Sequence, residues 1–523
     1  MTTIDERVAK GTAAQERAPL TAHASFVPAP GRPSPVASLE EQEVTREPDL
    51  VPVRHGRMMV SPFTFYRGAA KIMAEDLKGT PTAGLVVQLC GDAHLSNFGA
   101  FASPERRLVF DLNDFDETLP GPFEYDVKRM AASFVLAARD NGFSRAEAQA
   151  AAQESVTAYR EAMAEFAKQN TMAIWYASLD EAELTSFARV IAEGAGEKAA
   201  RKAAAQKTGA AKPDKAAKPD KAAKGGKSAK SAQKSGAKGA RKVEEAGAKE
   251  ALTKMQMARL AEKRLQKFSA KARTRDSLQA LSKLAEVVDG RYRIVSQPPV
   301  VIPLRDLTPE LSPEQYDGMI REQYRRYRAT LQPDRKHLLE QFEIVDVARK
   351  VVGVGSVGTR AFIALLQGRD SGDPLFLQAK EATPSVLEAH LPRSKYRNHG
   401  QRVVQGQRMM QAASDIFLGW TTGVDVSRHF YWRQLRDMKG SVVIEETTPL
   451  GLTLYGRLCG WTLARAHARS GDPVAIAAYL GETDAFDRAI TSFSERYADQ
   501  NERDYDEFAS AIKDGRLNCL DGV

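Results

Sequence analysis

A run of acidic residues in this 523-residue chain has the composition of a metal site. Residues 108–117 read Leu-Val-Phe-Asp-Leu-Asn-Asp-Phe-Asp-Glu, which predicts a β-strand that ends in clustered carboxylates. Carboxylates crowded at one strand end repel one another unless a cation neutralises them. Magnesium suits such a place, because proteins hold it through one or two carboxylates together with substrate phosphates. We therefore expect this acidic run to bind magnesium.

A second candidate group lies upstream, where residues 90–98 read Cys-Gly-Asp-Ala-His-Leu-Ser-Asn-Phe. An Asp followed five residues later by an Asn is the spacing of a phosphotransferase catalytic loop. In such a loop the Asp accepts the proton of the substrate hydroxyl and the Asn holds a metal ion. Asp92 and Asn97 suit these two roles. The alternative is a capped turn formed by Asp92, His94 and Asn97, in which His94 orders the loop.

A glycine-rich segment between two predicted strands indicates a third part of the site. Residues 353–358 read Gly-Val-Gly-Ser-Val-Gly, a pattern that also occurs in dinucleotide-binding turns. Dinucleotide folds follow the glycines with a helix, whereas residues 359–366 predict a strand, so we expect a hairpin that covers phosphates. The next strand carries Lys380, which could reach the α- and β-phosphates of a nucleotide, or could extend to solvent. The expected nucleotide contacts are Gly353, Gly355, Ser356, Gly358 and Lys380.

These motifs resemble the aminoglycoside phosphotransferase and choline kinase group, whose loop reads His-Gly-Asp-x-His-x-x-Asn. Cys90 stands where that group has its first His. The run DFDETLPGPFEYDV resembles the metal-binding motif, turn and helix of the group, with Asp114 as the metal-binding aspartate and Asp126 holding the catalytic-loop backbone. Asp111 competes with Asp114, because its separation from Asn97 is closer to typical kinase spacing. The resemblance implies ATP and magnesium as cofactors.

The motifs occur in an unusual order, since Gly353 and Lys380 follow Asp92 whereas the glycine loop and lysine of an ordinary kinase precede the catalytic loop. A circular permutation of the protein-kinase-like two-lobed fold restores the order. Residues 456–468 resemble the helix that directly precedes the catalytic loop in aminoglycoside phosphotransferases. A hinge would then follow the strand expected at 429–436, and the backbone of residues 435–439 would face the adenine.

Nearly the whole chain is also similar to a bacterial family catalogued as domain of unknown function 2252. The resemblance rests on RHGRMMVSPFTFYRG at 54–68, CGDAHLSNFG at 90–99, DLNDFDE at 111–117 and LQAKEA at 377–382. Grouping that family with the kinase-like fold agrees with the motifs above but supplies no substrate. Two roles suit the cluster of Arg54, Arg57 and Arg67 in the first segment: contact with phosphate or substrate, and structural ion pairing.

The elements that position these motifs predict an α+β fold. Three apolar runs in residues 342–382 indicate an antiparallel meander. A helix near 399–413, strands at 415–420 and 429–436, and helices from 452 to 512 follow it. We expect a disordered arm at 1–45, a disordered insert at 194–250, a nucleotide-binding small lobe at 341–440, and a catalytic lobe built from 46–193 together with the helical portions 251–340 and 441–523.

The net charge of +8 comes from one segment. Residues 198–242 contain 15 Lys or Arg and two Asp, which leaves a net charge of −5 on the rest of the chain. Such a segment could bind DNA or RNA electrostatically and without sequence preference, or could be an inert solubilising insertion. The chain has neither an apolar run near the roughly 20 residues of a membrane span nor a secretory signal. We therefore expect a cytoplasmic protein without a membrane partner.

The leading hypothesis is an ATP- and magnesium-dependent phosphotransferase acting on a hydroxyl of an unidentified small molecule or protein. Asp92 would be the catalytic base, Asn97, Asp114 and Asp116 would hold the metal, and Lys380 would bind the phosphates. The helix at 399–414 offers glutamines and arginines where a kinase carries the glutamate that pairs with its lysine. A nucleotidyl transferase on the same fold is therefore an alternative. A nucleotide-binding pseudokinase or scaffold recruited to nucleic acid through 198–242 is another.

Overall fold

The computed structural model describes residues 2–184, 263, 266–267, 269–275, 277–288, 290–435, 437–520 and 522. The insert at 194–250 lies outside the described residues, so its predicted disorder and its contacts with nucleic acid stay predictions. The elements below belong to the larger of two compact units, which comprises Met1–Leu179 and Lys271–Val523. Within the described ranges, no helix combines the length and the apolar character that a membrane crossing requires.

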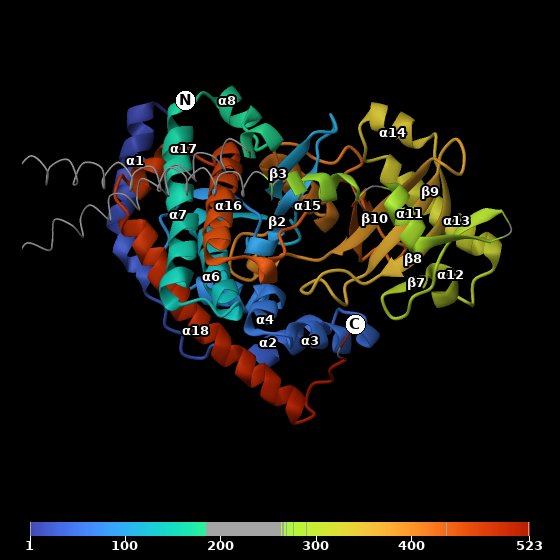
Figure 1. Cartoon of the computed structure of the whole chain (residues 1–523), viewed down its shortest axis with the longest axis horizontal. Helices are drawn as coiled ribbons and strands as arrows, with labels where there is room; N and C mark the ends of the chain where they lie inside the picture. The colour runs from blue at the N-terminus through green and yellow to red at the C-terminus, as the bar shows by residue number, and fades with distance from the viewer. Residues whose placement is uncertain are drawn as a thin grey trace, which may run out of the picture. The chain divides into compact units, whose positions relative to one another are not determined.

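A six-stranded antiparallel sheet forms one part of this unit, and the α+β class is confirmed (Figure 1). Its strand order is β11-β12-β10-β9-β8-β7. The predicted meander is confirmed as well, because β8, β9 and β10 are consecutive neighbours. Lys380 of β10 lies opposite Ala361 of β9 and Tyr431 of β12. The bounds are β7 Val301–Pro303, β8 Glu343–Lys350, β9 Ala361–Gln367, β10 Pro374–Ala382, β11 Gly419–Thr422 and β12 His429–Gln434.

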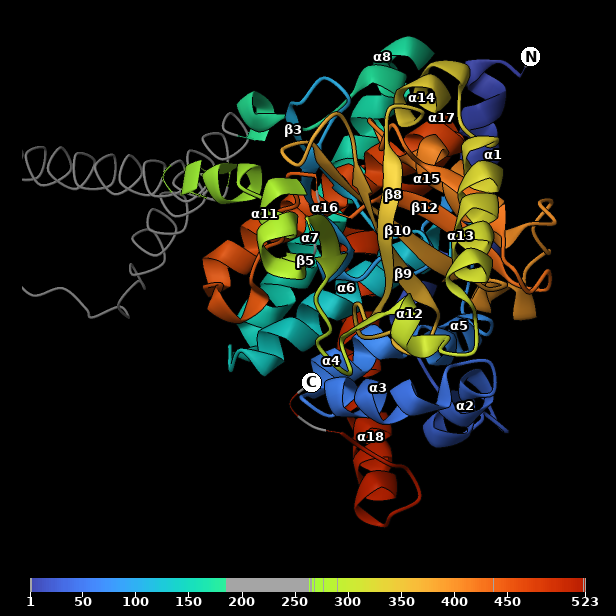
Figure 2. The same ribbon diagram turned by 90° about the vertical axis from the view of Figure 1, so that its right-hand side faces the viewer.

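Residues 277–339, which include the edge strand β7, cover both faces of the sheet, and Figure 2 shows α13 in front of the strands. On one face Tyr327 of α13 is fully buried and stacks on Trp432, with ring centroids 4.7 Å apart. On the other face Leu284 of α11 packs with Ile363 and Phe376. The bounds are α11 Ser277–Leu284, β5 Ala285–Val288, β6 Arg291–Ile294, α12 Leu304–Leu307, α13 Pro313–Arg328 and α14 Pro333–Leu339.

These contacts correct the assignment of residues 251–340 to the helical catalytic lobe. The described part of that range packs on the sheet and adds β5, β6 and β7 to the strands. The reason is the position of its apolar side chains, since Tyr324, Tyr327, Leu331 and Leu339 lose their solvent exposure only against the strands.

A helical group forms the other part of the unit, and the helices predicted from residue 452 onward are confirmed. The long helices α7 and α16 lie against each other (Figure 1). Glycines permit this, because a Cβ on Gly460 of α16 would lie 2.0 Å from the carbonyl oxygen of Ser155 in α7. The bounds are α6 Phe123–Asp140, α7 Arg145–Lys168, α8 Thr171–Tyr176, α15 His399–Met410, α16 Pro449–Ser470, α17 Pro473–Leu480 and α18 Ala485–Lys513.

Short elements connect the two parts. Strand β1 pairs with β4 in one two-stranded antiparallel sheet, and β2 pairs with β3, its neighbour in sequence, in another. The bounds are α3 Val51–Met58, α4 Pro62–Gly68, α5 Ala70–Leu77, β1 Val86–Leu89, β2 Phe98–Ala102, β3 Leu108–Leu112 and β4 Leu119–Pro122. The single-turn 3-10 helices are η1 Leu20–Ala24, η2 Pro48–Leu50, η3 Leu95–Asn97, η4 Val386–Ala389 and η5 Ile444–Glu446.

The expectation of a disordered arm at 1–45 is wrong. Residues Ile4–Arg17 form α1 and Pro35–Glu43 form α2. Helix α1 packs so closely on α17 that a Cβ on Gly11 would lie 2.1 Å from the carbonyl oxygen of Ala475. The buried side of α1 is made of Gly11 and Ala14, so its contact with the core uses small residues. Small buried residues produce no apolar periodicity, which explains why the sequence pattern failed here.

We expect Leu39→Ala to lower the free energy of unfolding by about 2–5 kcal/mol. Leu39 in α2 is fully buried and belongs to a cluster with Phe65 and Phe508. Val44 lies in the same segment and is 84% exposed. The control Val44→Ala should therefore change the free energy of unfolding by less than about 0.5 kcal/mol. Urea denaturation of the two variants checks this, and equal stabilities would contradict the packing of α2.

A buried histidine makes the stability depend on pH. His23 is fully buried with its Nε2 2.6 Å from the Tyr479 hydroxyl. Burial, and secondarily Lys128, lowers the pKa of His23 from 6.5 to about 3. Between these values the unfolded chain binds more protons than the folded one, so the free energy of unfolding falls by about 2 kcal/mol between pH 7 and pH 5. Urea denaturation should show a smaller fall in His23→Gln, and an equal fall would refute this assignment.

Candidate functional site

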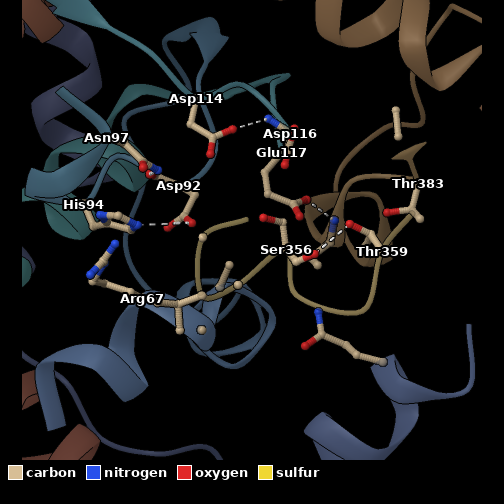
Figure 3. A pocket seen from close by; sticks show the side chains of 18 of the residues that line it. Arg67, Asp92, His94, Asn97, Asp114, Asp116, Glu117, Ser356, Thr359 and Thr383 are labelled. Atoms are coloured by element: carbon tan, nitrogen blue, oxygen red, sulfur yellow. Dashed lines mark hydrogen bonds and ion pairs between the residues drawn. The ribbon is translucent and has the colours of Figure 1, made fainter. Parts of the chain in front are cut away.

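One cavity of about 140 Å³ gathers motifs that are far apart in the sequence (Figure 3). The loop after β1, the loop after β3 and the glycine segment between β8 and β9 all line it. Of the predicted site residues, only Gly358 and Lys380 are not in its wall. The predicted residues that line it are Asp92, Asn97, Asp114, Asp116, Gly353, Gly355 and Ser356.

Hydrogen bonds from the first helix after the loop fix the Asp92 segment. Asp126 of α6 accepts hydrogen bonds from the backbone N–H groups of Cys90, at 2.8 Å, and Gly91, at 3.0 Å. The loop-holding role predicted for Asp126 is therefore confirmed. Gly91 has a φ of +85°, and a Cβ there would lie 2.2 Å from the carbonyl oxygen of Glu117. Only glycine suits such a position.

Asp92 and Asn97 are joined within this loop. The Asn97 amide donates to the backbone oxygen of Asp92 at 2.7 Å, so the Asn97 side-chain oxygen is its remaining acceptor. Arg129 of α6 donates through Nε to Asp92 Oδ1 at 2.7 Å. One carboxylate oxygen of Asp92 is thus held by a buried guanidinium while the side chain is still 20% exposed in the cavity.

His94 orders the loop. Its Nδ1 accepts the N–H of Ser96 at 3.2 Å, which caps η3 and places the remaining proton on Nε2. That nitrogen lies 3.8 Å from Asp92 Oδ2 (Figure 3). Burial, with the charges of Arg67 and Arg129, sets the pKa of His94 well below its ordinary value, so the ring is neutral at pH 7.

The acidic loop after β3 meets Lys380. The lysine Nζ lies 2.6 Å from Asp116 Oδ2 and 3.9 Å from Asp114 Oδ1. Tyr431, opposite Lys380 in the sheet, donates to Asp116 Oδ1 at 2.7 Å. Burial alone would raise the pKa of Asp116, but the lysine ammonium and these hydrogen bonds bring it below its ordinary value. Asp116 therefore holds the Lys380 ammonium, and residues 399–414 contain no acidic side chain that could do so.

The negative charge of the buried Asp114 carboxylate is less well balanced by nearby positive charge than that of Asp116. Burial raises its pKa, and the neighbouring Asp116 carboxylate raises it further. A carboxylate that is desolvated beside another one favours a cation in its place. Among the described residues, no three His, Cys, Asp or Glu side chains alone form a metal cage. Asp114, Asp116 and the Asn97 oxygen still fit magnesium, which takes its other ligands from water and phosphate.

Asp111, the competing candidate, is placed differently. It is 1% exposed, it forms an ion pair with the equally buried Arg465, and it is absent from the cavity wall. The backbone N–H groups of Leu112 and Ala412 each donate to it at 2.8 Å. Because Asp111 is buried outside the cavity and paired with Arg465, its role is structural.

The glycine segment joins two antiparallel strands as predicted. Gly353 and Gly358 have φ values of +70° and +89°. A Cβ on Gly355 would lie 3.0 Å from the backbone oxygen of Arg67, so the segment approaches α4 closely. The Glu47 N–H donates to the Gly358 carbonyl at 2.8 Å. The loop is therefore fixed by the N-terminal helices as well as by its strands.

The three arginines of the basic cluster have different surroundings. Arg54 is completely buried and pairs with Glu43 at 3.0 Å, which is a structural role. Arg57 donates to the Gly353 carbonyl at 2.6 Å and so holds the glycine segment. Arg67 lines the cavity beside Asp92 and His94.

The adenine-facing hinge expected at 435–439 stays a prediction, although protein groups bond to part of its backbone. The N–H groups of Leu435 and Met438 donate to the carbonyls of Phe376 and Arg275 at 3.0 and 2.9 Å. The Lys439 carbonyl accepts from the Arg275 guanidinium at 3.0 Å. Protein groups thus occupy three of the backbone polar groups of this segment. The sequence could not reveal this, because Arg275 lies 160 residues upstream of Leu435.

Sequence reasoning missed part of the wall. Arg46 was not identified as a site residue, because it directly follows residues 1–45, which were expected to be disordered. Glu117 is adjacent to Asp116, and burial raises its pKa to about 7. Acidity and position in the carboxylate run were signals that could have identified Glu117. The other missed lining residues are Gln42, Gly68, Ala70, Val354, Thr359, Glu381, Ala382, Thr383 and Val386.

Comparison with known proteins identifies one family. The family model described as an uncharacterized protein conserved in bacteria (DUF2252) matches residues 46–251 and 227–511. No curated protein and no solved structure matches the chain.

Proposed function

The chain belongs to the DUF2252 family of uncharacterized bacterial proteins, and for it we propose an ATP- and magnesium-dependent phosphotransferase that acts on a hydroxyl of a small molecule or protein. One observation carries the proposal: Asp92, Asp114 and the glycine segment meet in a single cavity, next to an ion pair of Lys380 with Asp116. Base, metal ligands and phosphate-binding groups are the parts that phosphoryl transfer requires.

Asp92 is the proposed base. Arg129 fixes its Oδ1, which leaves Oδ2 to accept a proton from an acceptor hydroxyl in the cavity. Magnesium held by Asp114, Asp116 and Asn97 would neutralise charge on the phosphates. Lys380 would divide its contacts between Asp116 and a phosphate oxygen, because its ammonium carries three donors.

A circularly permuted kinase-like fold is part of the proposal. The run β8, glycine segment, β9, β10 with Lys380, α15, β11 and β12, followed by α16, has the element order of a kinase up to its catalytic loop. The loop and acidic motif of a kinase would come next, and here they are found after β1 and β3, near the other terminus. Contacts of Tyr455 in α16 with the carbonyls of Leu95 and Phe98, at 2.8 and 3.1 Å, support this joining.

Nucleotidyl transfer is the second candidate. Protein groups bond to the N–H groups of Leu435 and Met438 and to the Lys439 carbonyl, which leaves fewer backbone groups for an adenine than a kinase hinge offers. If the adenine binds elsewhere in the protein, a different phosphate of the nucleotide can face Asp92. Transfer of the α-phosphate with its nucleoside would follow from such an orientation.

The test is turnover of ATP by the purified full chain, followed in parallel with α-labelled and γ-labelled nucleotide. Magnesium-dependent transfer or release of the γ-label supports the phosphotransferase. Magnesium-dependent incorporation of the α-label supports nucleotidyl transfer instead. If the chain turns over neither and magnesium-ATP does not raise its melting temperature, both proposals are overturned.

A further inference from the structure

The cavity carries positive as well as negative groups, and the positive ones come from the N-terminal segment. Arg67 of α4 lies on the side of Asp92 and His94, and its guanidinium points toward His94 (Figure 3). Arg46, just after α2, lies by the glycine segment and donates to the Val357 carbonyl. The carboxylates Asp114 and Asp116 belong to a different loop.

The Arg67 guanidinium has few protein partners for its hydrogen-bond donors and its charge. Its Nε is buried, and among the described residues no acceptor bonds to it. The nearest aromatic ring, Phe63, is 5.9 Å from its Cζ. Burial lowers the pKa of Arg67, and the more distant charges of Glu445 and Asp92 only oppose this. Burying a guanidinium without a full set of acceptors is costly, and an anion bound beside it offsets part of that cost.

Arg46 repeats this pattern. Its Nε is also buried without a partner in the part of the chain that the structure describes. Burial and the charge of Arg54 lower its pKa, while Glu43, Glu117 and Glu381 counteract them. Two separate arginines of one cavity thus each have an Nε without a protein acceptor.

We infer that Arg67, together with Arg46, binds a phosphate-type oxyanion in this cavity. Guanidinium forks match the oxygen geometry of phosphate, and their charge-assisted hydrogen bonds are strong. The inference rests on the proposed function only for the source of the oxyanion, which is either the terminal phosphate of ATP or an anionic group on the acceptor. Arg67 is beside the proposed base, where both of these would lie during transfer.

Three binding titrations separate the sources, with magnesium-ATP, magnesium-ADP, and inorganic phosphate added to the ADP complex. If Arg67 holds the terminal phosphate, Arg67→Gln weakens ATP binding about 10- to 100-fold and leaves ADP binding unchanged. If it holds the acceptor, both nucleotides bind as before and binding of inorganic phosphate is lost. Affinities within twofold of wild type for all three probes would overturn the inference.

Two variants guard against indirect effects. Arg67→Lys keeps the charge and should recover part of the affinity that Arg67→Gln loses. Arg369→Gln removes an 85% exposed arginine of the β9–β10 turn and should change nothing. An equal loss in Arg369→Gln would show a mere effect of net charge and would overturn the site.

The proposed function can fail independently of this site. If wild type binds neither nucleotide, the nucleotide-dependent proposal fails, and inorganic pyrophosphate alone then becomes the probe. Pyrophosphate binding that Arg67→Gln weakens at least tenfold would still support the oxyanion site. Absence of pyrophosphate binding by wild type would overturn it.

Discussion

Asp92→Asn is expected to reduce magnesium-dependent ATP turnover by about 10²- to 10⁴-fold, the usual contribution of a positioned general base. The amide oxygen of the variant can still accept the hydrogen bond that Arg129 donates to Asp92 at 2.7 Å. The loop backbone is bonded to Asp126 and not to the Asp92 carboxylate, so the fold should persist. Initial rates with labelled ATP measure the loss, and a melting temperature checks the fold.

The matched control is Asp334→Asn, which changes a 62% exposed side chain of α14 by the same atoms. It should retain the wild-type rate. Magnesium-ATP should also bind to Asp92→Asn with nearly its wild-type affinity, because Asp114 and Asp116 are intact. A variant that turns over ATP at the wild-type rate would remove Asp92 from the chemistry.

Local patterns predicted the sheet well. The apolar runs around the glycine segment became β8, β9 and β10, since each strand is paired with its neighbour in sequence. The polar helix at 399–413 became α15, and strand β12 lies within the predicted range 429–436. Boundaries were less accurate, as for β11, which begins at Gly419 rather than at 415.

The failures concern contacts between segments distant in sequence. Helix α1 is stabilised by α17, which lies more than 450 residues away. Helix α13 packs on the sheet although its apolar residues are interspersed with many charges. Neither contact has a local signature, because burial of small or scattered apolar residues depends on a partner that composition does not specify.

The site was predictable where chemistry requires particular residue types in sequence order. The five-residue spacing singled out Asp92 and Asn97, and the acidic run with its family resemblance singled out Asp114 and Asp116, and all four line the cavity. Arg46 and Arg67 have no such spacing, and their common cavity arises only in the folded chain. The pairing of Lys380 with Asp116 was likewise hidden, since the expected partner was a glutamate on the following helix.

Arg465→Met is expected to lower the free energy of unfolding by about 3–5 kcal/mol. Arg465 and Asp111 are both 1% exposed, and Arg465 also donates to the Met410 carbonyl at 2.6 Å. Burial raises the pKa of Asp111 in spite of this arginine, so the carboxylate depends on its partner for compensation. Methionine fills a similar volume and leaves a buried charge unpaired. Urea denaturation measures the loss.

Variants of the Arg465–Asp111 pair also distinguish a structural role of Asp111 from a role in metal binding. Adding Asp111→Leu to Arg465→Met removes both charges, and the double variant should recover most of the stability. Arg488→Met breaks an exposed pair with Asp484 and should cost less than about 1 kcal/mol. Asp114→Asn should abolish magnesium-dependent binding of ATP without loss of stability, whereas the double variant should retain that binding. If ATP binding by the double variant no longer depends on magnesium, Asp111 is a metal ligand after all. That result would contradict its position outside the cavity.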